Sequence, residues 1–152
     1  MYLLSRSLLL FPLIAVSSTL AQSIPFYIGT SKSEGIHLAR LQTDSGKLSP
    51  FQTVAQLESP GFLAKHPTAP YLYATNASFE RPNSGGVSAY RIDSNQALIA
   101  LNHQPTQGRG ACHLSVDPSG QCLVAVNYGS GNVIAYQILD DGSLSARARS
   151  IS

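Results

Sequence analysis

The stretch SPGFLAKHPTAPYLYATN at residues 59–76 decides the fold, because it recurs without a gap as GACHLSVDPSGQCLVAVN at residues 110–127. The two copies, offset by 51 residues, share Leu, Pro, Leu, Ala and Asn at matching positions. Each copy predicts a strand, a proline-containing turn and a second strand, followed by a glycine-rich loop and a third strand. A period of about 45–50 residues with several short strands per unit is typical of β-propeller blades.

Further strands are predicted on the N-terminal side of the repeat, at residues 24–30, 35–41 and 48–56. Within the blades the apolar runs, such as those at 71–75 and 122–126, are nearly continuous, which predicts strands that are buried on both faces. No segment has the apolar periodicity of a helix. The sequence therefore predicts an all-β partial propeller at residues 22–152, with about two and a half to three four-stranded blades.

The first 21 residues have the pattern of a secretory leader. Arg6 precedes the apolar run LLLFPLIAV at residues 8–16, and small residues follow up to Ala21. This order predicts a signal peptide at 1–21 and an exported protein, periplasmic or secreted. The run is short for a membrane span, so no membrane association is expected after cleavage. A leader that does not function would leave the protein in the cytoplasm.

Charge and cysteine content narrow the possible functions. Ten Lys and Arg face eight Asp and Glu without a basic stripe, so no nucleic-acid partner is expected. A two-residue turn at 118–119 would pair Cys112 with Ala125 and Cys122 with Ser115. The two thiols would then lie on opposite faces of the sheet and too far apart for a disulfide. We expect two buried, reduced thiols.

The segment at 110–138 closely resembles the 6-phosphogluconolactonase family of seven-bladed propellers, whose superfamily includes the fungal carboxymuconate lactonizing enzyme. The resemblance rests on His-x-x-x-Asp-Pro-Ser-Gly at 113–120 and on Asn-Tyr-Gly-Ser-Gly at 127–131, and it extends over 26–145. It implies a carboxylic ester hydrolase of carbohydrate metabolism, of the kind that serves the pentose phosphate pathway. The implied site lies at the mouth of the central channel and takes a small lactone, and no cofactor is indicated.

The chain departs from the family pattern in three ways. Ala111 stands where the family usually has Pro. The later blades of the family are absent, and fewer than three blades are too few to close a propeller. We therefore expect an N-terminal piece of a longer protein or a truncated gene product. A signal peptide, finally, does not suit an enzyme that acts on cytosolic sugar phosphates.

His113 is the predicted catalytic residue. The preceding repeat has Phe62 at the same position, so an apolar ring is replaced by one that exchanges a proton near neutral pH. Lactone hydrolysis needs a general base to activate water and a donor to stabilise the oxyanion. A channel-facing His113 could serve as that base or bind the ligand. The alternative is a histidine tied to a neighbouring carbonyl within its blade.

Three further residues are predicted to bind substrate. Arg109 could pair with a carboxylate or a phosphate, or simply be solvated. Asn127 and Tyr128 end a strand at a glycine-rich loop, although the recurrence of Asn127 as Asn76 favours a turn-capping role. No metal site is indicated, because the remaining histidines lack partners at ligand spacing. No Gly-x-Ser-x-Gly motif supports a serine esterase.

Three functional hypotheses follow. The first is a lactone hydrolase of the 6-phosphogluconolactonase type, or a lactonizing enzyme working in the opposite direction. The second is an exported propeller that binds a ligand or a partner without turnover. The third is an incomplete fragment without activity of its own, which would oligomerise or aggregate through its open blade edge.

Overall fold

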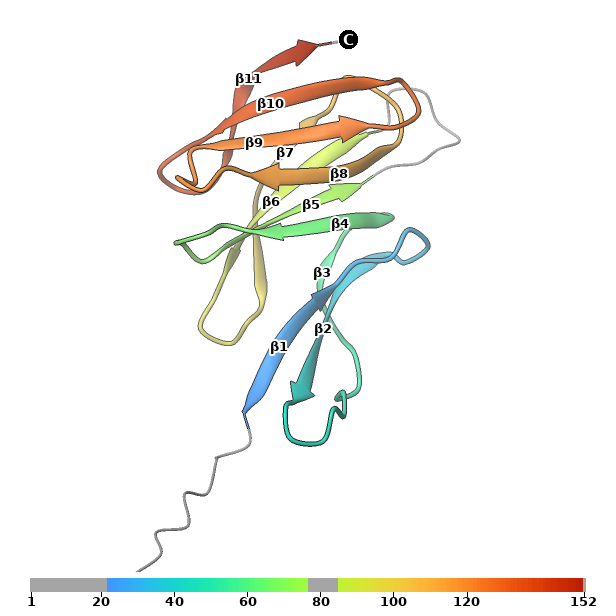
Figure 1. The fold of residues 1–152 in the computed structure, drawn as a ribbon, viewed down its shortest axis with the longest axis vertical. Helices are drawn as coiled ribbons and strands as arrows, with labels where there is room; N and C mark the ends of the chain where they lie inside the picture. Colours follow the sequence, from blue (N-terminus) through green and yellow to red (C-terminus); the bar gives the residue numbers. More distant parts are fainter. Residues whose placement is uncertain (1–21, 77–84, 152) are drawn as a thin grey trace, which may run out of the picture.

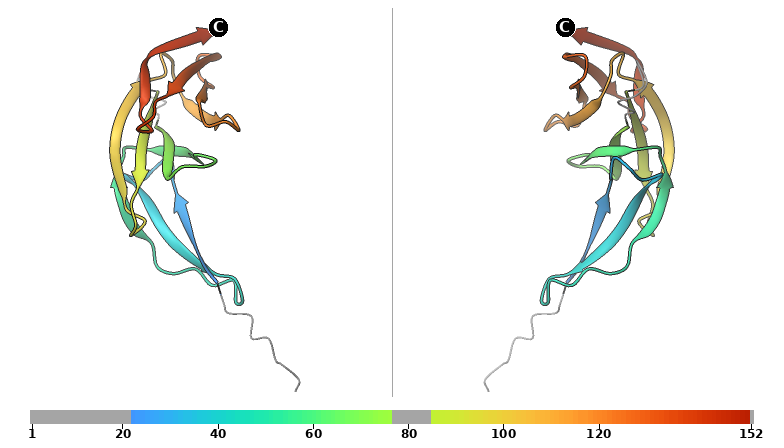
Figure 2. Two further views of the ribbon diagram at one scale, coloured as in Figure 1. Left: turned by 90° about the vertical axis from the view of Figure 1, so that its left-hand side faces the viewer. Right: turned by 90° about the vertical axis from the view of Figure 1, so that its right-hand side faces the viewer.

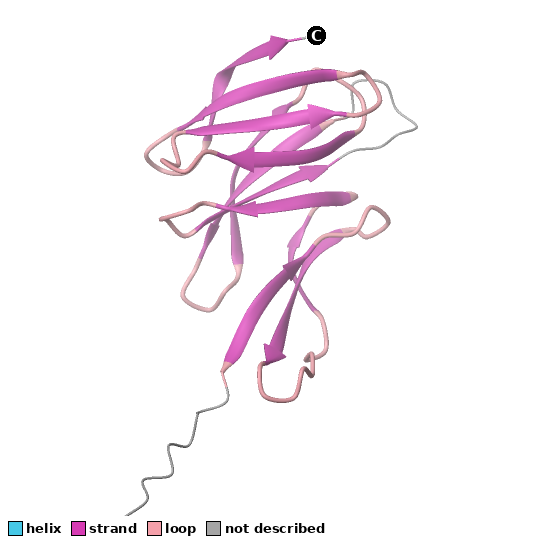
Figure 3. Ribbon diagram, in the orientation of Figure 1, coloured by secondary structure: helices cyan, strands magenta, loops and turns pink. Residues whose placement is uncertain are grey.

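The computed structural model of the protein describes residues 22–76 and 85–151, so the leader predicted at 1–21 lies outside the described residues. In this part of the chain the secondary structure is β throughout, connected by turns and loops (Figure 3). The described residues contain no helix that could cross a membrane. The all-β prediction is confirmed.

The strands form three antiparallel sheets in chain order (Figure 1). The first sheet has the order β1 (Ser23–Ile28), β2 (Gly35–Gln42) and β3 (Gln52–Gln56). The second has β4 (Pro60–Lys65), β5 (Tyr71–Asn76), β6 (Gly86–Ile92) and β7 (Leu98–Pro105). The third has β8 (Ala111–Val116), β9 (Cys122–Asn127), β10 (Asn132–Ile138) and β11 (Leu144–Ile151). These meanders are the blades predicted from the repeat.

The first blade has three strands in the described residues, because it lacks a counterpart of the first strand of the other two blades. Phe26-Tyr27 of β1 matches Leu72-Tyr73 of β5, so β1 corresponds to the second strand of the other blades. The described residues supply no strand at the edge of β1 that β4 and β8 occupy in their own sheets. The outer strand is shorter than predicted and begins at Gln52. Leu48 makes only an isolated bridge to Leu41.

The sheets pack face to face along an arc (Figure 2). One apolar cluster, which includes Ile36, Leu72 and Leu98, fills the joint between the first and second blades. A second cluster, which includes Tyr73 and Leu123, fills the joint between the second and third blades. Between the second and third blades, contact is most extensive at the β4 and β8 edges. The two sheets therefore fan out from these edges, as propeller blades do around their axis.

The turn between β8 and β9 corrects the predicted register. Residues 118–121 form a four-residue loop, and Asp117 N donates to Cys122 O at 3.0 Å. The pairing is thereby shifted by two residues, so that Leu114 lies opposite Ala125. The loop is longer than predicted because the Asp117 carboxylate accepts the backbone N–H groups of Ser119, Gln121 and Cys122, which holds the wider turn.

The cysteine prediction was partly wrong. Cys112 and Cys122 are unbridged, as expected, but both are exposed rather than buried. β9 is likewise not buried on both faces: Leu123 and Ala125 are fully buried, whereas Val124 is 38% exposed. The reason is the position of the strand, since one face of the third blade packs on the second blade and nothing in the described chain covers the other.

Candidate functional site

A β-bulge at the start of β8 positions the predicted catalytic histidine. Ala111 pairs with Asn127 and His113 with Val126, which leaves Cys112 as an extra residue in β8. The bulge breaks the alternation of faces, so the side chains of Cys112 and His113 are both exposed. β4 has an irregularity at the same point of its own sheet. The repeat therefore builds a bulge at the start of both innermost strands.

His113 lies against the residue that replaces it in the preceding repeat. Its ring centroid is 4.1 Å from that of Phe62, and the two rings are tilted by 43°. The contact joins β4 to β8, the two strands at which the neighbouring blades lie side by side. Phe62 thus covers one side of the imidazole with an apolar ring, while the His113 side chain remains exposed.

The ring nitrogens distinguish His113 from the other three histidines. Each of those makes a hydrogen bond through a ring nitrogen: His37 to Thr53 Oγ1 (3.1 Å), His66 to Gly120 O (3.0 Å) and His103 to Ser88 Oγ (3.1 Å). Within residues 22–76 and 85–151, His113 has a ring contact but no such bond. The alternative of a histidine tied to a carbonyl of its blade is therefore not realised in this part of the chain, and the His113 side chain is exposed.

Arg109 lies in the connection between β7 and β8, which is joined to the β9–β10 turn. The Arg109 backbone N–H donates to Ser130 Oγ at 2.9 Å, and its carbonyl accepts from Gly129 N at 3.0 Å. The guanidinium Nη2 donates to Gly129 O at 3.0 Å. The side chain is thus held at one point, and its remaining N–H donors are exposed and able to meet an anionic or carbonyl group.

Asn127 holds this pair of loops together from beneath. It is fully buried, its Oδ1 accepts from Thr106 Oγ1 at 2.7 Å, and its Nδ2 donates to Thr106 O at 2.9 Å and to Asn132 Oδ1 at 3.1 Å. With both ends of the amide engaged and the side chain fully buried, Asn127 is not available to a ligand. The geometry supports the capping role and makes Asn127 a positioning residue for the Arg109 connection.

Tyr128 follows Asn127 and points away from the protein. Its side chain is 80% exposed, while its backbone N–H donates to Gly110 O at 2.9 Å. The fold therefore brings Arg109 and Tyr128 to one rim, at the end of the blade where β8 starts and β9 ends (Figure 1). His113 lies further along β8. Its Cα atom is at most about 13 Å from that of Arg109, because an extended strand rises roughly 3.3 Å per residue.

Comparison with known proteins identifies the family of this chain. The model of the family described as "Lactonase, 7-bladed beta-propeller" matches residues 25–152. The chain belongs to this lactonase family. It is 38% identical over 122 residues to 6-phosphogluconolactonase of Bacillus subtilis strain 168, a match that covers 78% of the chain and 34% of that protein. It is 30% identical over 111 residues to 6-phosphogluconolactonase of Formosa agariphila, covering 72% and 31%.

A solved structure is similar to this chain in both fold and sequence. A Bacteroides fragilis protein described as a candidate 6-phosphogluconolactonase superposes with a TM-score of 0.73 at 28% identity, over 84% of this chain and 36% of the other. The chain thus spans about a third of the length of these members of the lactonase family. The predicted resemblance to the family is confirmed.

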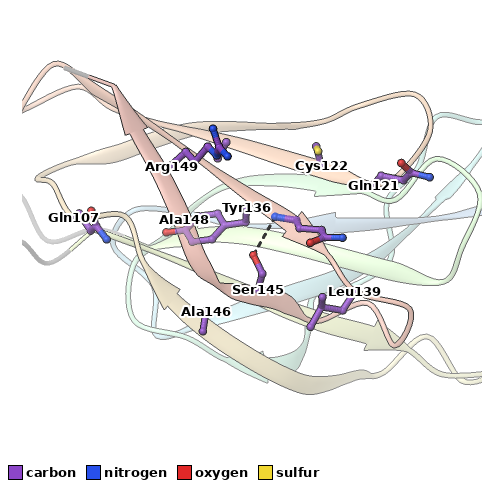
Figure 4. Close-up of a pocket in the computed structure, with 11 residues that line it drawn as sticks. Gln107, Gln121, Cys122, Tyr136, Leu139, Ser145, Ala146, Ala148 and Arg149 are labelled. Carbon is purple, nitrogen blue, oxygen red and sulfur yellow. Dashed lines mark hydrogen bonds between the residues drawn. The ribbon is translucent and has the colours of Figure 1, made fainter.

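A hollow of this lactonase-family chain lies away from the predicted site residues. A groove of about 980 Å³ runs over the uncovered face of the third blade, and none of the predicted site residues lines it (Figure 4). Gln107, Gln121, Tyr136 and Arg149 are among its lining residues. The groove is therefore separate from the residues predicted to form the functional site. No group of three or more possible metal ligands gathers in the described ranges.

Sequence reasoning missed two supporting features of the site. It gave Thr106 and Asn132 no role, although both contribute to the buried network around Asn127. It also did not place Phe62 against His113, although the ungapped repeat already set the two at equivalent points of adjacent inner strands. The recurrence of Asn76 and Asn127 was the available signal for a structural amide.

Proposed function

We propose that the lactonase-family chain contributes to the hydrolysis of a sugar lactone, with His113 as general base. The observation that carries this proposal is the exposed imidazole on an innermost strand, with both nitrogens free of described protein partners and with Phe62 on one side. A base must keep a nitrogen available to the water that it activates, and the other three histidines of the chain have committed theirs.

In the proposed step, the His113 imidazole takes a proton from water while the water oxygen bonds to the lactone carbonyl carbon. The carbonyl oxygen becomes an oxyanion in the tetrahedral intermediate. Collapse of the intermediate re-forms the carbonyl and breaks the bond to the ring oxygen. The ring oxygen takes the proton from the imidazolium, which yields the open hydroxy acid and restores the base.

Arg109 and Tyr128 are proposed to hold the sugar at the rim. The free N–H donors of Arg109 suit a phosphate or the hydroxyls of the sugar, and the exposed ring of Tyr128 offers a flat apolar surface to the pyranose. A substrate with a 6-phosphate would gain the stronger, charge-assisted bond. The family relatives named 6-phosphogluconolactonase support that choice.

The test is proton release during hydrolysis of 6-phosphoglucono-δ-lactone and of the unphosphorylated lactone, measured against the spontaneous rate. His113→Ala is expected to lower turnover by about 100-fold or more, the usual scale of a general base. His37→Gln, which changes a histidine bonded to Thr53 in the first blade, is the matched control and is expected to keep the rate. Equal rates in the His113 variant and the parent chain would remove His113 from the mechanism.

A binding module without turnover is the second candidate, and the rim supports it because Arg109 and Tyr128 could hold a ligand without chemistry. Binding of the unreactive open acid, followed by the imidazole NMR signals of His113, separates the two. Saturable binding with hydrolysis at the spontaneous rate would favour the module.

We also propose that the protein is exported, on the pattern of residues 1–21. N-terminal sequencing of protein recovered outside the cytoplasm should begin near residue 22. Recovery of chains that begin at Met1 from the cytoplasm alone would contradict export.

A further inference from the structure

The bulge in β4 depends on a bond from outside the strand ladder. The register of β4 against β5 shifts between Pro60 and Leu63. Gly61 and Phe62 therefore both oppose a single residue of β5, Thr75. A bulge of this kind leaves backbone polar groups without partners in the ladder. Such groups need another partner, because an unpaired N–H inside a protein costs free energy.

The side chain of Thr75 supplies the missing bond. Thr75 is fully buried, and its Oγ1 accepts from the Phe62 backbone N–H at 2.8 Å. The same hydroxyl donates to Phe62 O in a longer bond of 3.5 Å. One hydroxyl thus engages both backbone polar groups of Phe62. Removal of this hydroxyl would leave the Phe62 N–H without its acceptor, so the hydroxyl fixes the path of the chain through the bulge.

Gly61 allows the hydroxyl to approach the bulge closely. A Cβ placed on Gly61 would lie 3.1 Å from Thr75 Oγ1 and 4.0 Å from the carbonyl oxygen of Ala111, the first residue of β8. The β4 bulge therefore lies between the Thr75 hydroxyl and the inner strand of the next blade. A side chain at residue 61 would press on the group that holds Phe62.

The third blade places His113 without such a hydroxyl. Val126 of β9 stands where β5 has Thr75. His113, the counterpart of Phe62, pairs with Val126 in the strand ladder, and the extra residue of that bulge is Cys112. The repeat thus accepts a valine, which resembles threonine in shape, at this place in a blade. The hydroxyl of Thr75 is therefore needed for the backbone of Phe62 rather than for packing.

The Phe62 ring carries this placement to His113. The two ring centroids are 4.1 Å apart, and the rings are tilted by 43°. The His113 side chain is exposed and makes no hydrogen bond within the described part of the chain. An imidazole in that situation can change its rotamer unless a neighbour packs against it. The Phe62 ring is such a neighbour.

We propose that Thr75 is a positioning residue, whose hydroxyl holds the β4 bulge so that the Phe62 ring orients the His113 imidazole. The catalytic consequence rests on the function proposed above, in which His113 is the general base. A base acts only when its nitrogen points to the water that it activates, and a small misplacement of the reacting groups lowers the rate. Loss of the hydroxyl is expected to lower kcat by about tenfold and to change KM little.

Thr75→Val in the full 152-residue chain tests the proposal, because it removes the hydroxyl and nearly keeps the shape. The readout is the NMR signals of the His113 Hε1 and Hδ2 protons, assigned by their loss in His113→Ala. The ring current of Phe62 shifts these signals, and Phe62→Leu provides the positions for an uncovered imidazole. We expect Thr75→Val to move the signals toward those positions, with the fall in kcat. Thr75→Ser, which keeps a hydroxyl, should retain the parent signals and rate.

Ser88→Ala is the matched control. Ser88 is a buried residue of the same blade, and its hydroxyl bonds His103 instead of the bulge. This variant should lose some stability without any movement of the His113 signals. If Thr75→Val does not fold, Gly61→Ala is the second variant, because its methyl group would press on the Thr75 hydroxyl and should also move the signals.

Unchanged His113 signals in a folded Thr75→Val chain, or in Gly61→Ala where it replaces that variant, would overturn the proposal. Equal shifts in Thr75→Val and Ser88→Ala would overturn it as well, since they would reflect general loosening of the blade. Moved signals at the parent rate, in a chain that His113→Ala inactivates, would overturn the catalytic consequence. Moved signals together with a parent rate in His113→Ala would uphold the role of Thr75 and refute His113 as the base.

Discussion

Replacing Tyr73 by Phe removes one hydroxyl from the joint between the second and third blades. Tyr73 is fully buried, and its hydroxyl donates to the carbonyl of Gly142, which is buried in the next blade. Without the hydroxyl that carbonyl has lost a partner where water does not readily enter, at a cost of about 1–3 kcal/mol. For a domain of this size, we expect the melting temperature to fall by roughly 3–5 °C per kcal/mol.

Tyr27→Phe is the matched control, because Tyr27 makes the same bond at 3.0 Å to Gln96 O but is only half-buried. In Tyr27→Phe, water can donate to the Gln96 carbonyl in place of the hydroxyl. We therefore expect the free energy of unfolding to fall by only about 0.5–1 kcal/mol. Urea unfolding followed by tyrosine fluorescence measures both variants at one protein concentration, since self-association would shift apparent stability. Equal losses in the two variants, or none in Tyr73→Phe, would refute the assignment of the tyrosines as joint contacts that depend on burial.

Two further predictions concern the β8–β9 turn. The Ser119 hydroxyl first, and the Cys122 backbone N–H next, lower the pKa of Asp117 to about 2. Because the folded pKa lies below the unfolded one, this contribution to stability is present above about pH 4 and is lost as the pH falls toward 2. Asp117→Asn should therefore flatten acid unfolding in that window, and an unchanged pH profile would contradict the role of the carboxylate. Gly120→Ala should destabilise more than Gly131→Ala, because both residues have positive φ but only at Gly120 would a Cβ meet a neighbour, the His66 ring at 2.3 Å. Thermal melting measures the loss of stability in each variant. Similar losses would show that backbone strain at positive φ, and not the contact with the His66 ring, sets the cost of the substitution.

The repeat predicted much of the fold because each blade is assembled from contacts between neighbouring strands in the sequence. It located the strands, the turns and the equivalence of Phe62 and His113, which lie in contact. It did not predict the register of the β8–β9 hairpin, since the Asp117 carboxylate holds a four-residue loop that hydrophobic pattern alone does not specify. It also left the roles of Asn76 and Asn127 open between capping and binding.

The sequence by itself determined the strand order and the division into blades, because a period of roughly 50 residues with alternating strands and turns has few other folded solutions. Only the tertiary structure decided which side chains of a strand are covered. Tyr73 and Val124 occupy the same place in their blades, yet one is fully buried and the other is 38% exposed. Burial depends on the neighbouring sheet, which lies far away in the sequence, and so the free imidazole of His113, the buried amide of Asn127 and the open end faces emerged only in three dimensions.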